Sequence, residues 1–424
     1  MKSEEFGATG NGVTDDSAAI QSAINAAISA GGGIVFLPVG TYLVGSTLVL
    51  GNSAGIKGVS LVGAGTDATL ITTNNATGDI IQIGTAGDGG GNTTGQSTGC
   101  AVRSLTINSN VTRTGGSGIS LIKTNQTVIE DVNMNNHYVF IMILGGEGEY
   151  PYNVTTYINR GVYGFPPNPS SDPGRQNPNI GIWMNGNTNT NGLIISDIVA
   201  NGPVGAWVRV TGSGGFQMRN CDFLGAYWGL LIDPGQGELQ APIGTYYANY
   251  GFVLDCEFDT SIQYGIYLNP AGTSFINGWT FKGCWTSSSN PNAIIGSDQG
   301  SGVLIGGNIN NGVSGISFIG HIAINNNGNG FFLGESSADV QIIGSIIGGN
   351  TASGIVVGAS VGGIIITGNR VGTTAGKGGN QYGLFVTTGC TDMIISNNNF
   401  LLNSIANMAV GSSGSTIIIE NNLY

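Results

Sequence analysis

A glycine followed by an apolar, a variable and another apolar position recurs along most of the chain. The copies lie at 117–121, 180–184, 204–208, 228–232, 264–268, 301–305, 329–333, 353–357 and 382–386. The basic step is 24 residues, as from Gly181 to Gly205 and from Gly330 to Gly354, and longer steps are 24 plus an inserted loop. One coil of three short strands and three turns has this length. The pattern therefore predicts an all-β fold, a right-handed parallel β-helix.

A second column of the repeat precedes each glycine and carries Asp or Asn. Its members are Asp131, Asp197, Asn220 and Asp255. A tight turn at this point favours residues that tolerate left-handed backbone, so we expect turn formers here and not catalysts. Cys221, Cys256 and Cys284 follow in the next, inward column, and all five cysteines are expected to be buried thiols and not metal ligands.

The variable position of the glycine motif is expected to point outward, yet it is apolar in most coils. It is occupied by Trp183, Trp207, Leu231, Tyr267, Leu304, Phe332, Val356 and Phe385. An apolar stripe of this length should not remain in water. We interpret it as a subunit interface rather than a sugar platform.

The first 33 residues differ from the repeat and predict a capping segment, with the β-helix over 34–424. Thr14 is the expected N-cap of an amphipathic helix whose apolar face holds Ile20, Ile24 and Ile28. Such a helix would cover the open end of a solenoid. No basic and apolar leader precedes it and no apolar run approaches 18 residues, so we expect a soluble protein without a membrane partner.

Composition and charge limit the partners. The chain has 75 glycines, 40% hydrophobic residues and only 8% charged residues, which suits a turn-rich solenoid whose surface is covered by small polar side chains or by other subunits. Its net charge of −12 and its 12 Lys and Arg residues disfavour nucleic acid, because phosphate binding needs clustered basic residues.

The segments 6–21 and 33–42, Phe-Gly-Ala-Thr-Gly-Asn-Gly-Val-Thr-Asp-Asp-Ser-Ala-Ala-Ile-Gln and Gly-Ile-Val-Phe-Leu-Pro-Val-Gly-Thr-Tyr, resemble the N-terminal signature of the pectate-lyase-like β-helix superfamily. That superfamily includes bacteriophage tailspike depolymerases, polysaccharide hydrolases and lyases. The resemblance implies a polysaccharide substrate, a homotrimer as in tailspikes, and a virion tail or extracellular location. The polygalacturonase pattern is missing, because Gly-His-Gly and Arg-Ile-Lys are absent and the histidines are His137 and His321.

Two insertions, at about 145–179 and 234–250, are expected to form the walls of a groove, since loops added at the same turn of neighbouring coils gather together. Aromatic rings beside carboxylates suit carbohydrate. The residues expected to bind substrate are Tyr246, Tyr247, Tyr250, Trp228, Trp285, Arg219 and Lys282. The tyrosines serve equally well to pack their loops down.

Acidic residues are densest near the middle coils. Aligning the Asn-Cys-Asp-Phe sequence that ends at Phe223 with the Asp-Cys-Glu-Phe sequence that ends at Phe258 stacks Asp222 beside Glu257, with Asp259 two residues further. Close carboxylates raise one another's pKa, which suits acid and base catalysis of glycoside hydrolysis. We expect the catalytic pair among Asp222, Glu257, Asp259 and Glu238.

The sequence leaves open other roles for the acidic cluster and other activities for the protein. A solvated acidic face explains the cluster nearly as well, and a calcium site is a third explanation, although no cofactor is required. A polysaccharide lyase would instead use Arg219 or Lys282 as the base, and a glycan-binding spike without catalysis would need neither.

Overall fold

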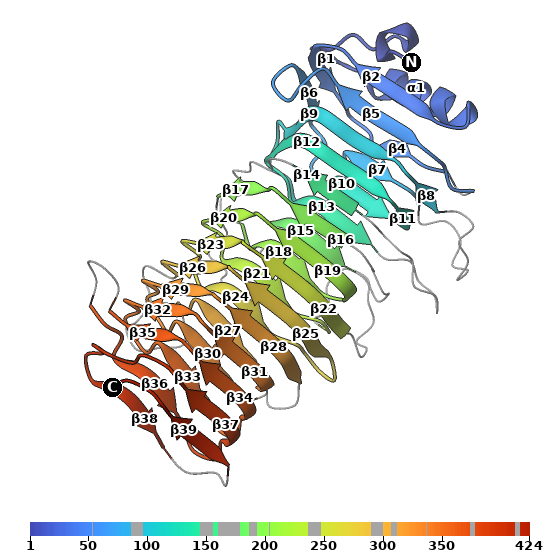
Figure 1. The fold of residues 1–424 in the computed structure, drawn as a ribbon. Coiled ribbons are helices and arrows are strands. Elements are labelled where there is room, and N and C mark those ends of the chain that lie inside the picture. The colour runs from blue at the N-terminus through green and yellow to red at the C-terminus, as the bar shows by residue number, and fades with distance from the viewer. Residues whose placement is uncertain are drawn as a thin grey trace. The chain divides into compact units, whose positions relative to one another are not determined.

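The structure is a computed structural model, and it describes the chain apart from residues 53, 86–95, 145–155, 160–178, 186–192, 203, 236–246, 290–299, 307–311, 336, 374–377 and 412–415. The residues form two compact units, Met1–Gln217 and Met218–Tyr424. Figure 1 shows the strands of both units.

The first unit begins with the 3-10 helix η1 (Ser3–Phe6) and the helix α1 (Ser17–Ser29), followed by stacked parallel strands. One series of strands consists of β1 (Asn11–Asp15), β2 (Gly33–Leu37), β3 (Gly40–Leu43), β5 (Val59–Gly63), β6 (Thr69–Thr73), β9 (Ala101–Ser109), β12 (Thr127–Asn135), β14 (Thr156–Asn159) and β16 (Leu193–Ser196). A second series consists of β4 (Leu48–Leu50), β7 (Ile81–Ile83), β10 (Ser117–Ile122), β13 (Val139–Leu144), β15 (Ile180–Asn185) and β18 (Ala206–Val210). Shorter strands are β8 (Ser97–Thr98), β11 (Thr124–Asn125) and β17 (Val199–Asn201), and β19 (Ser213–Arg219) contains the unit boundary.

The second unit has three parallel sheets, which we name by their strands. The long-strand sheet contains β22 (Tyr247–Leu254), β25 (Phe275–Lys282), β28 (Val313–Ile319), β31 (Ser337–Ile343), β34 (Gly362–Thr367), β37 (Thr391–Ser396) and β39 (Ile417–Glu420). The short-strand sheet contains β20 (Asp222–Leu224), β23 (Glu257–Asp259), β26 (Trp285–Ser287), β29 (Ile322–Ile324), β32 (Ile346–Gly348) and β35 (Arg370–Gly372). The third sheet contains β21 (Trp228–Ile232), β24 (Tyr264–Leu268), β27 (Val303–Ile305), β30 (Phe331–Leu333), β33 (Ile355–Val357), β36 (Tyr382–Val386) and β38 (Ala406–Val410).

The chain visits the long-strand, short-strand and third sheets in turn and then repeats the circuit one strand further along. Ile322 pairs with Ile346 and Ile346 with Arg370, so each of these circuits takes 24 residues. The fold is a right-handed parallel β-helix, as the sequence predicts. None of the helices in the described ranges has the length and apolar character of a membrane span.

The turn-forming Asx residues adopt the backbone that the sequence predicts. Asp131, Asp197, Asn220 and Asp255 have φ values of 52°, 55°, 53° and 52°. The left-handed region is accessible to Asn and Asp because their short polar side chains bond locally. All five cysteines are buried free thiols, which confirms the inward placement of that column.

The N-terminal helix begins later than predicted. Thr14 lies in β1, and Asp16 is the N-cap of α1. The Asp16 carboxylate makes no capping bond, because its oxygens accept hydrogen bonds from the backbone N–H groups of Thr9 and Gly10 at 2.7 and 3.1 Å. Ile20 and Ile24 are fully buried as expected, and Ala23 and Ala27 complete the apolar face, while Ile28 is only half-buried.

The repeat register predicted for Trp207 is wrong by two residues. Ile180 pairs with Ala206 and Ile182 with Val208, so Trp207 stacks on Gly181 and not on Trp183. A Cβ at Gly181 would approach the Trp207 ring to 2.7 Å, whereas the glycine leaves room for it. Trp207 therefore packs inside against Phe140, with ring centroids 5.9 Å apart.

The predicted apolar outer stripe is largely covered within the single chain. Trp183, Leu231 and Leu304 are exposed by only 0%, 3% and 4%. Trp183 packs with the outer residues Val139 and Met142. Trp183, Leu231 and Leu304 therefore do not form the exposed surface that an interface between subunits requires, and the sequence interpretation is wrong for them. Tyr267, Phe332 and Phe385 are partly exposed, and for these residues the interface stays a prediction.

Buried asparagines form a ladder along one corner of the second unit. The Asn398 Oδ1 accepts hydrogen bonds from the backbone N–H and the side-chain amide of Asn369, both at 2.9 Å. The Asn398 amide in turn donates to Asn422 Oδ1 at 2.9 Å and to the Ile366 carbonyl at 2.9 Å. Each rung thus satisfies buried backbone groups where the chain turns from the long-strand to the short-strand sheet.

Candidate active site

The first outward position of each short strand forms a continuous column in the second unit. Its register partners, in order, are Asp222, Glu257, Trp285, Ile322, Ile346, Arg370, Asn399 and Leu423. We name this set the short-strand column. Neighbouring members lie on strands about 4.8 Å apart. The column begins with two carboxylates and passes an aromatic ring before it reaches an arginine.

The stacking of Asp222 beside Glu257 that the sequence predicts is confirmed. The two residues are direct register partners on β20 and β23. The next residues on each strand, Phe223 and Phe258, are fully buried and stack with centroids 5.8 Å apart. Because side chains alternate along a strand, these inner rings fix the carboxylates on the outer face.

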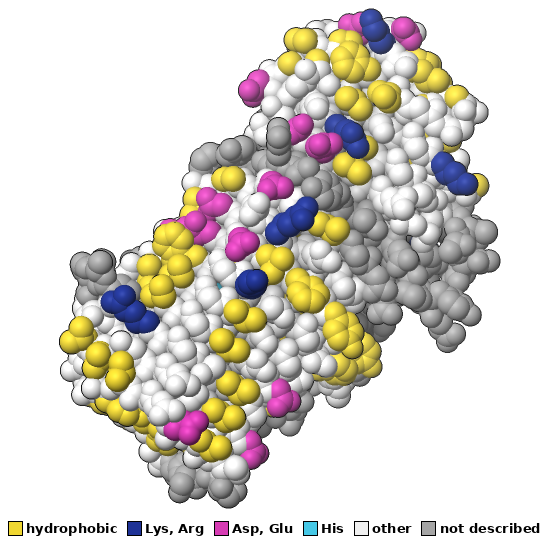
Figure 2. Space-filling view, viewed as in Figure 1, with side chains coloured by type: hydrophobic (Ala, Val, Ile, Leu, Met, Phe, Trp, Pro, Cys, Tyr) yellow, Lys and Arg dark blue, Asp and Glu magenta, His cyan; other side chains and the backbone are white. Residues whose placement is uncertain are grey.

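The local environment favours the protonated forms of both acids. Partial burial, followed by repulsion from Asp259, raises the pKa of Asp222 above its ordinary value. Burial also raises the pKa of Glu257, with smaller contributions from Asp222 and Asp259. The Asp222 Oδ1 is buried and accepts no hydrogen bond in the described structure. Figure 2 shows acidic side chains gathered over β20 and β23.

Asp259 is held in a fixed orientation by neighbouring donors. Its Oδ1 accepts a hydrogen bond from the Thr260 backbone N–H at 2.7 Å and another from the Ser287 hydroxyl. Ser287 is the register partner of Asp259 on β26. Sequence reasoning missed this serine, although extending the same alignment by one coil places it there.

Three of the predicted substrate-binding residues lie near the acids. Trp285 is the register partner of Glu257 and is 36% exposed, so part of its ring faces solvent beside the carboxylate. Lys282 and Arg219 are exposed at the ends of β25 and β19, each three residues before the column position of its own coil. An aromatic ring therefore lies beside Glu257, and each cation lies one turn before the short-strand column.

Other predicted residues are placed elsewhere. Trp228 lies on the third sheet, is only 8% exposed and donates its indole N–H to Gln263 at 2.9 Å. Tyr247 and Tyr250 belong to β22, and Tyr247 lies seven residues, roughly 23 Å of extended strand, before Leu254. Glu238 and Tyr246 lie outside the described residues, as does most of both predicted insertions.

The exposed tyrosines form a separate aromatic patch on the long-strand sheet. Tyr247 and Tyr250 are 46% and 63% exposed. The Tyr247 ring packs on Phe275 with centroids 4.4 Å apart. The structure therefore does not bring these tyrosines together with the carboxylates.

Neither histidine is accessible for chemistry. His137 and His321 are fully buried, and burial lowers the pKa of each to about 3. The His321 ring lies 3.1 Å from the Thr286 hydroxyl, inside the coil. Within the ranges that the structure describes, no group of three or more His, Cys, Asp or Glu side chains is arranged to hold a metal ion.

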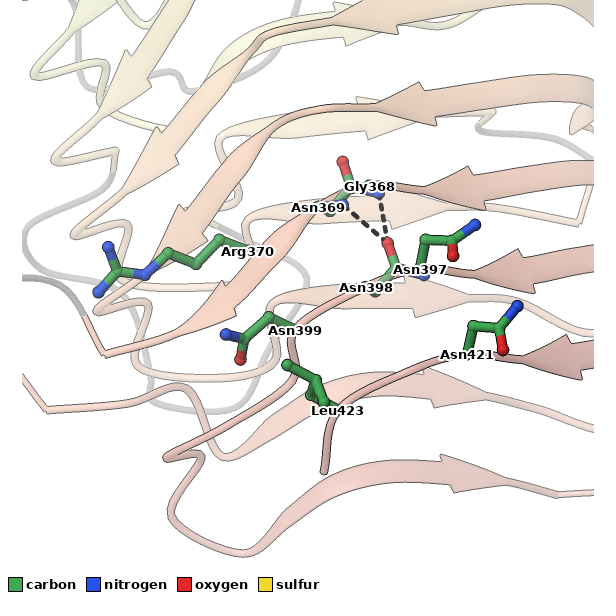
Figure 3. Close-up of a pocket in the computed structure, with 8 residues that line it drawn as sticks. All are labelled: Gly368, Asn369, Arg370, Asn397, Asn398, Asn399, Asn421 and Leu423. Carbon is green, nitrogen blue, oxygen red and sulfur yellow. Dashed lines mark hydrogen bonds between the residues drawn. The ribbon is translucent and has the colours of Figure 1, made fainter.

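A cavity of about 460 Å³ lies at the other end of the short-strand column (Figure 3). It is lined by Gly368, Asn369, Arg370, Asn397, Asn398, Asn399, Asn421 and Leu423. Arg370 extends to one side of the turn, whereas Asn397 and Asn421 extend to the other. On the Arg370 side the lining offers one guanidinium and the Asn399 amide, whereas the Asn369 and Asn398 amides are buried in the asparagine ladder.

A family model described as rhamnogalacturonase A/epimerase, pectate lyase-like, matches residues 2–237, more than half of the chain. The chain belongs to this family. Mannuronan C5-epimerase AlgE4 of Azotobacter vinelandii is 49% identical over 70 residues, which are 16% of this chain and 13% of that protein. Alginate lyase 7 of the same organism is 49% identical over 70 residues, 16% of this chain and 8% of that protein. The chain thus matches only a small part of these relatives' length.

Solved structures share the fold over nearly the whole chain. Tailspike protein 3 of bacteriophage CBA120 superposes with a TM-score of 0.71 at 15% identity, covering 99% of this chain and 61% of that one. A mutant tailspike of Escherichia coli bacteriophage HK620, in complex with a pentasaccharide, gives 0.57 at 14% identity and covers 99% and 78%. The A-module of the Azotobacter vinelandii epimerase AlgE6 gives 0.56 at 16% identity and covers 100% and 98%. At these identities the likeness concerns the fold.

Proposed function

We propose that the chain is a polysaccharide depolymerase, a tailspike-like glycoside hydrolase that cleaves a bacterial surface or extracellular glycan. The observation that carries the proposal is the direct pairing of Asp222 and Glu257 on neighbouring strands, with the pKa of each raised by burial. Family membership and the tailspike structures support a polysaccharide substrate and a location on a virion tail or outside the cell.

In the proposed reaction, one carboxyl group of the pair donates its proton to the glycosidic oxygen as the bond to the anomeric carbon breaks. The other carboxylate either attacks that carbon or removes a proton from the attacking water, and one water is consumed per bond cleaved. A raised pKa suits the acid, because the proton must still be present near neutral pH. Asp259, oriented by Ser287, contributes negative charge that favours the protonated acid.

The test is incubation of the protein with a panel of bacterial capsular and exopolysaccharides, followed by mass spectrometry of the products. Hydrolysis adds one water to each product pair. Asp222→Asn and Glu257→Gln should each lower the rate by about 10²- to 10⁴-fold. Asp392→Asn is the matched control, because Asp392 is exposed on the long-strand sheet of the same unit and its left-handed backbone suits Asn.

A polysaccharide lyase on the same scaffold is the second candidate. It is favoured by the exposed cations Arg219 and Lys282 beside the acids, and by the name of the matching alginate lyase. Elimination leaves an unsaturated uronate, whose products lack the added water and absorb ultraviolet light. Loss of activity in Lys282→Gln or Arg219→Gln, with full activity in Glu257→Gln, would replace the hydrolase by this candidate.

Two further alternatives are separated by the same assay. A glycan-binding spike without catalysis would bind but never cut a glycan, and Asp222→Asn and Glu257→Gln would leave binding unchanged. If calcium occupied the acidic cluster, a chelator would abolish activity and added calcium would restore it. Acid and base catalysis by the carboxylates alone predicts the same rate with and without chelator.

A further inference from the structure

The cavity at Arg370 lies on the same column as the proposed catalytic pair. From Glu257 the column passes through Trp285, Ile322 and Ile346 before it reaches Arg370. These four steps span about 19 Å at the usual strand spacing. The pair and the cavity are therefore joined by a single row of side chains on one sheet face.

The residues between the two ends suit the faces of sugar rings. Trp285 and Ile346 are 36% and 41% exposed, and Ile322 is partly exposed. Isolated apolar side chains on a surface are ordinary, but here they form one row in register. Sugar rings present C–H faces that pack on such side chains, while their hydroxyls reach water or amides.

Arg370 has little to neutralise its charge. In the described part of the chain its guanidinium makes one long hydrogen bond, of 3.5 Å, to the Thr373 carbonyl. None of the eight residues that line the cavity is acidic, although the chain as a whole has a net charge of −12. A guanidinium forms paired, charge-assisted hydrogen bonds with a carboxylate. The Asn399 amide, which extends to the same side, suits a sugar hydroxyl.

We propose that the Arg370 cavity is a distal subsite that binds the carboxylate of an acidic sugar in the same glycan chain that is cleaved at Asp222 and Glu257. This inference rests on the proposed function and adds its substrate class, a glycan with an acidic sugar at intervals. A pyranose unit advances a chain by roughly one strand spacing, ~4.8 Å, so the acidic sugar lies about four units from the cleaved bond. The carboxylates at the other end of the column favour a neutral unit there.

The test measures binding of size-fractionated uronate oligosaccharides, two to eight units long, to the Glu257→Gln variant by calorimetry. Carboxyl-reduced versions of the same oligosaccharides are the neutral controls. Arg370→Ala should weaken binding of acidic oligosaccharides of five or more units by about 10-fold or more, and Arg370→Lys by less. Binding of shorter or neutral oligosaccharides should change by less than about twofold, within the scatter of such measurements.

Lys57→Gln is the matched control for net charge, because Lys57 is an exposed lysine of the first unit. The proposal is overturned if Arg370→Ala and Lys57→Gln weaken binding equally, or if the loss of affinity in Arg370→Ala is the same for short and long oligosaccharides or for acidic and neutral ones. A different result would overturn the proposed function alone. In that case Asp222→Asn and Glu257→Gln would cleave the glycan at the wild-type rate, while Arg370→Ala would still weaken the binding of long acidic oligosaccharides.

Discussion

At the scale of single residues, the paired acids of the short-strand column combine two opposing requirements. Their partly buried placement, together with repulsion from neighbouring carboxylates, raises their pKa values and suits proton transfer. The same placement makes the ionised forms costly at neutral pH. Under the proposed function, these acids are retained for catalysis at the expense of stability.

Asp222→Asn should therefore raise the melting temperature at pH 7. The pKa of Asp222 in the fold lies above its ordinary value of 3.8, so the carboxyl stabilises the fold below pH 3.8 and loses this contribution as the pH rises through the raised pKa. Asn is neutral at every pH and avoids the loss. Thermal unfolding at pH 7 and at about pH 3 measures the difference in melting temperature between the variant and the wild type. This difference should vanish at the lower pH. An unchanged or lower melting temperature at pH 7 contradicts this, with Asp392→Asn as the control.

Residue-level reasoning from the sequence found the acids but not their surroundings. The alignment of Asp222 with Glu257 succeeds because left-handed turns at Asn220 and Asp255 start both short strands at the same point. Arg370 escaped notice, since a single arginine among Gly, Asn and Thr carries no motif. Only its place in the register connects it with Glu257.

At the scale of elements, the coil repeat predicts most of the fold. It fails where a glycine of one coil pairs with a large side chain of the next coil and not with the next glycine of the repeat. Gly181 marks the space that a ring from the next coil occupies, and Trp207 fills it. A sequence repeat aligns glycine with glycine, whereas packing here pairs glycine with tryptophan. The expectation that Tyr247 lies near the carboxylates fails for a different reason. The eight-residue strand β22 places it at the opposite end from the turn that leads to Glu257.

The asparagine ladder should be the most sensitive polar element of the second unit. Asn398→Ala removes the acceptor of two Asn369 hydrogen bonds and the donor to Ile366 and Asn422, and leaves buried groups unsatisfied. We expect a loss of about 2–5 kcal/mol in the free energy of unfolding, measured by urea denaturation. Asn397→Gly, at the exposed neighbour with left-handed backbone, should cost less than about 1 kcal/mol. Equal losses in the free energy of unfolding for the two variants would contradict a stabilising role of the ladder hydrogen bonds.

At the scale of the whole molecule, the proposal of a homotrimer no longer rests on the glycine-motif stripe. It rests on the 8% content of charged residues and on exposed apolar side chains of the long-strand sheet, among them Phe252, Ile394 and Ile418. Such side chains suit burial between copies of the chain.

Light scattering should therefore give about three times the 43.2 kDa mass of the chain. Ile394→Glu should shift the mass toward that of one chain, because a charge buried in an apolar contact is costly. Ile262→Glu, at a residue of similar exposure (39% against 39%) that follows β23, is the control. A wild-type mass of one chain at micromolar concentration contradicts the trimer.

Each 24-residue circuit of the second unit adds one strand spacing to the distance between two positions of the short-strand column. Residues 322–345 form one complete circuit, so their deletion would join His321 to Ile346 and bring Arg370 one strand closer to Glu257 while every other neighbour in the column stays the same. Insertion of a circuit would lengthen the interval by the same amount. With the proposed subsite at Arg370, the number of coils between Glu257 and Arg370 sets the number of sugar units between the cleaved bond and the acidic sugar. Gain or loss of one coil would then match a glycan whose acidic sugar lies one unit farther away or nearer.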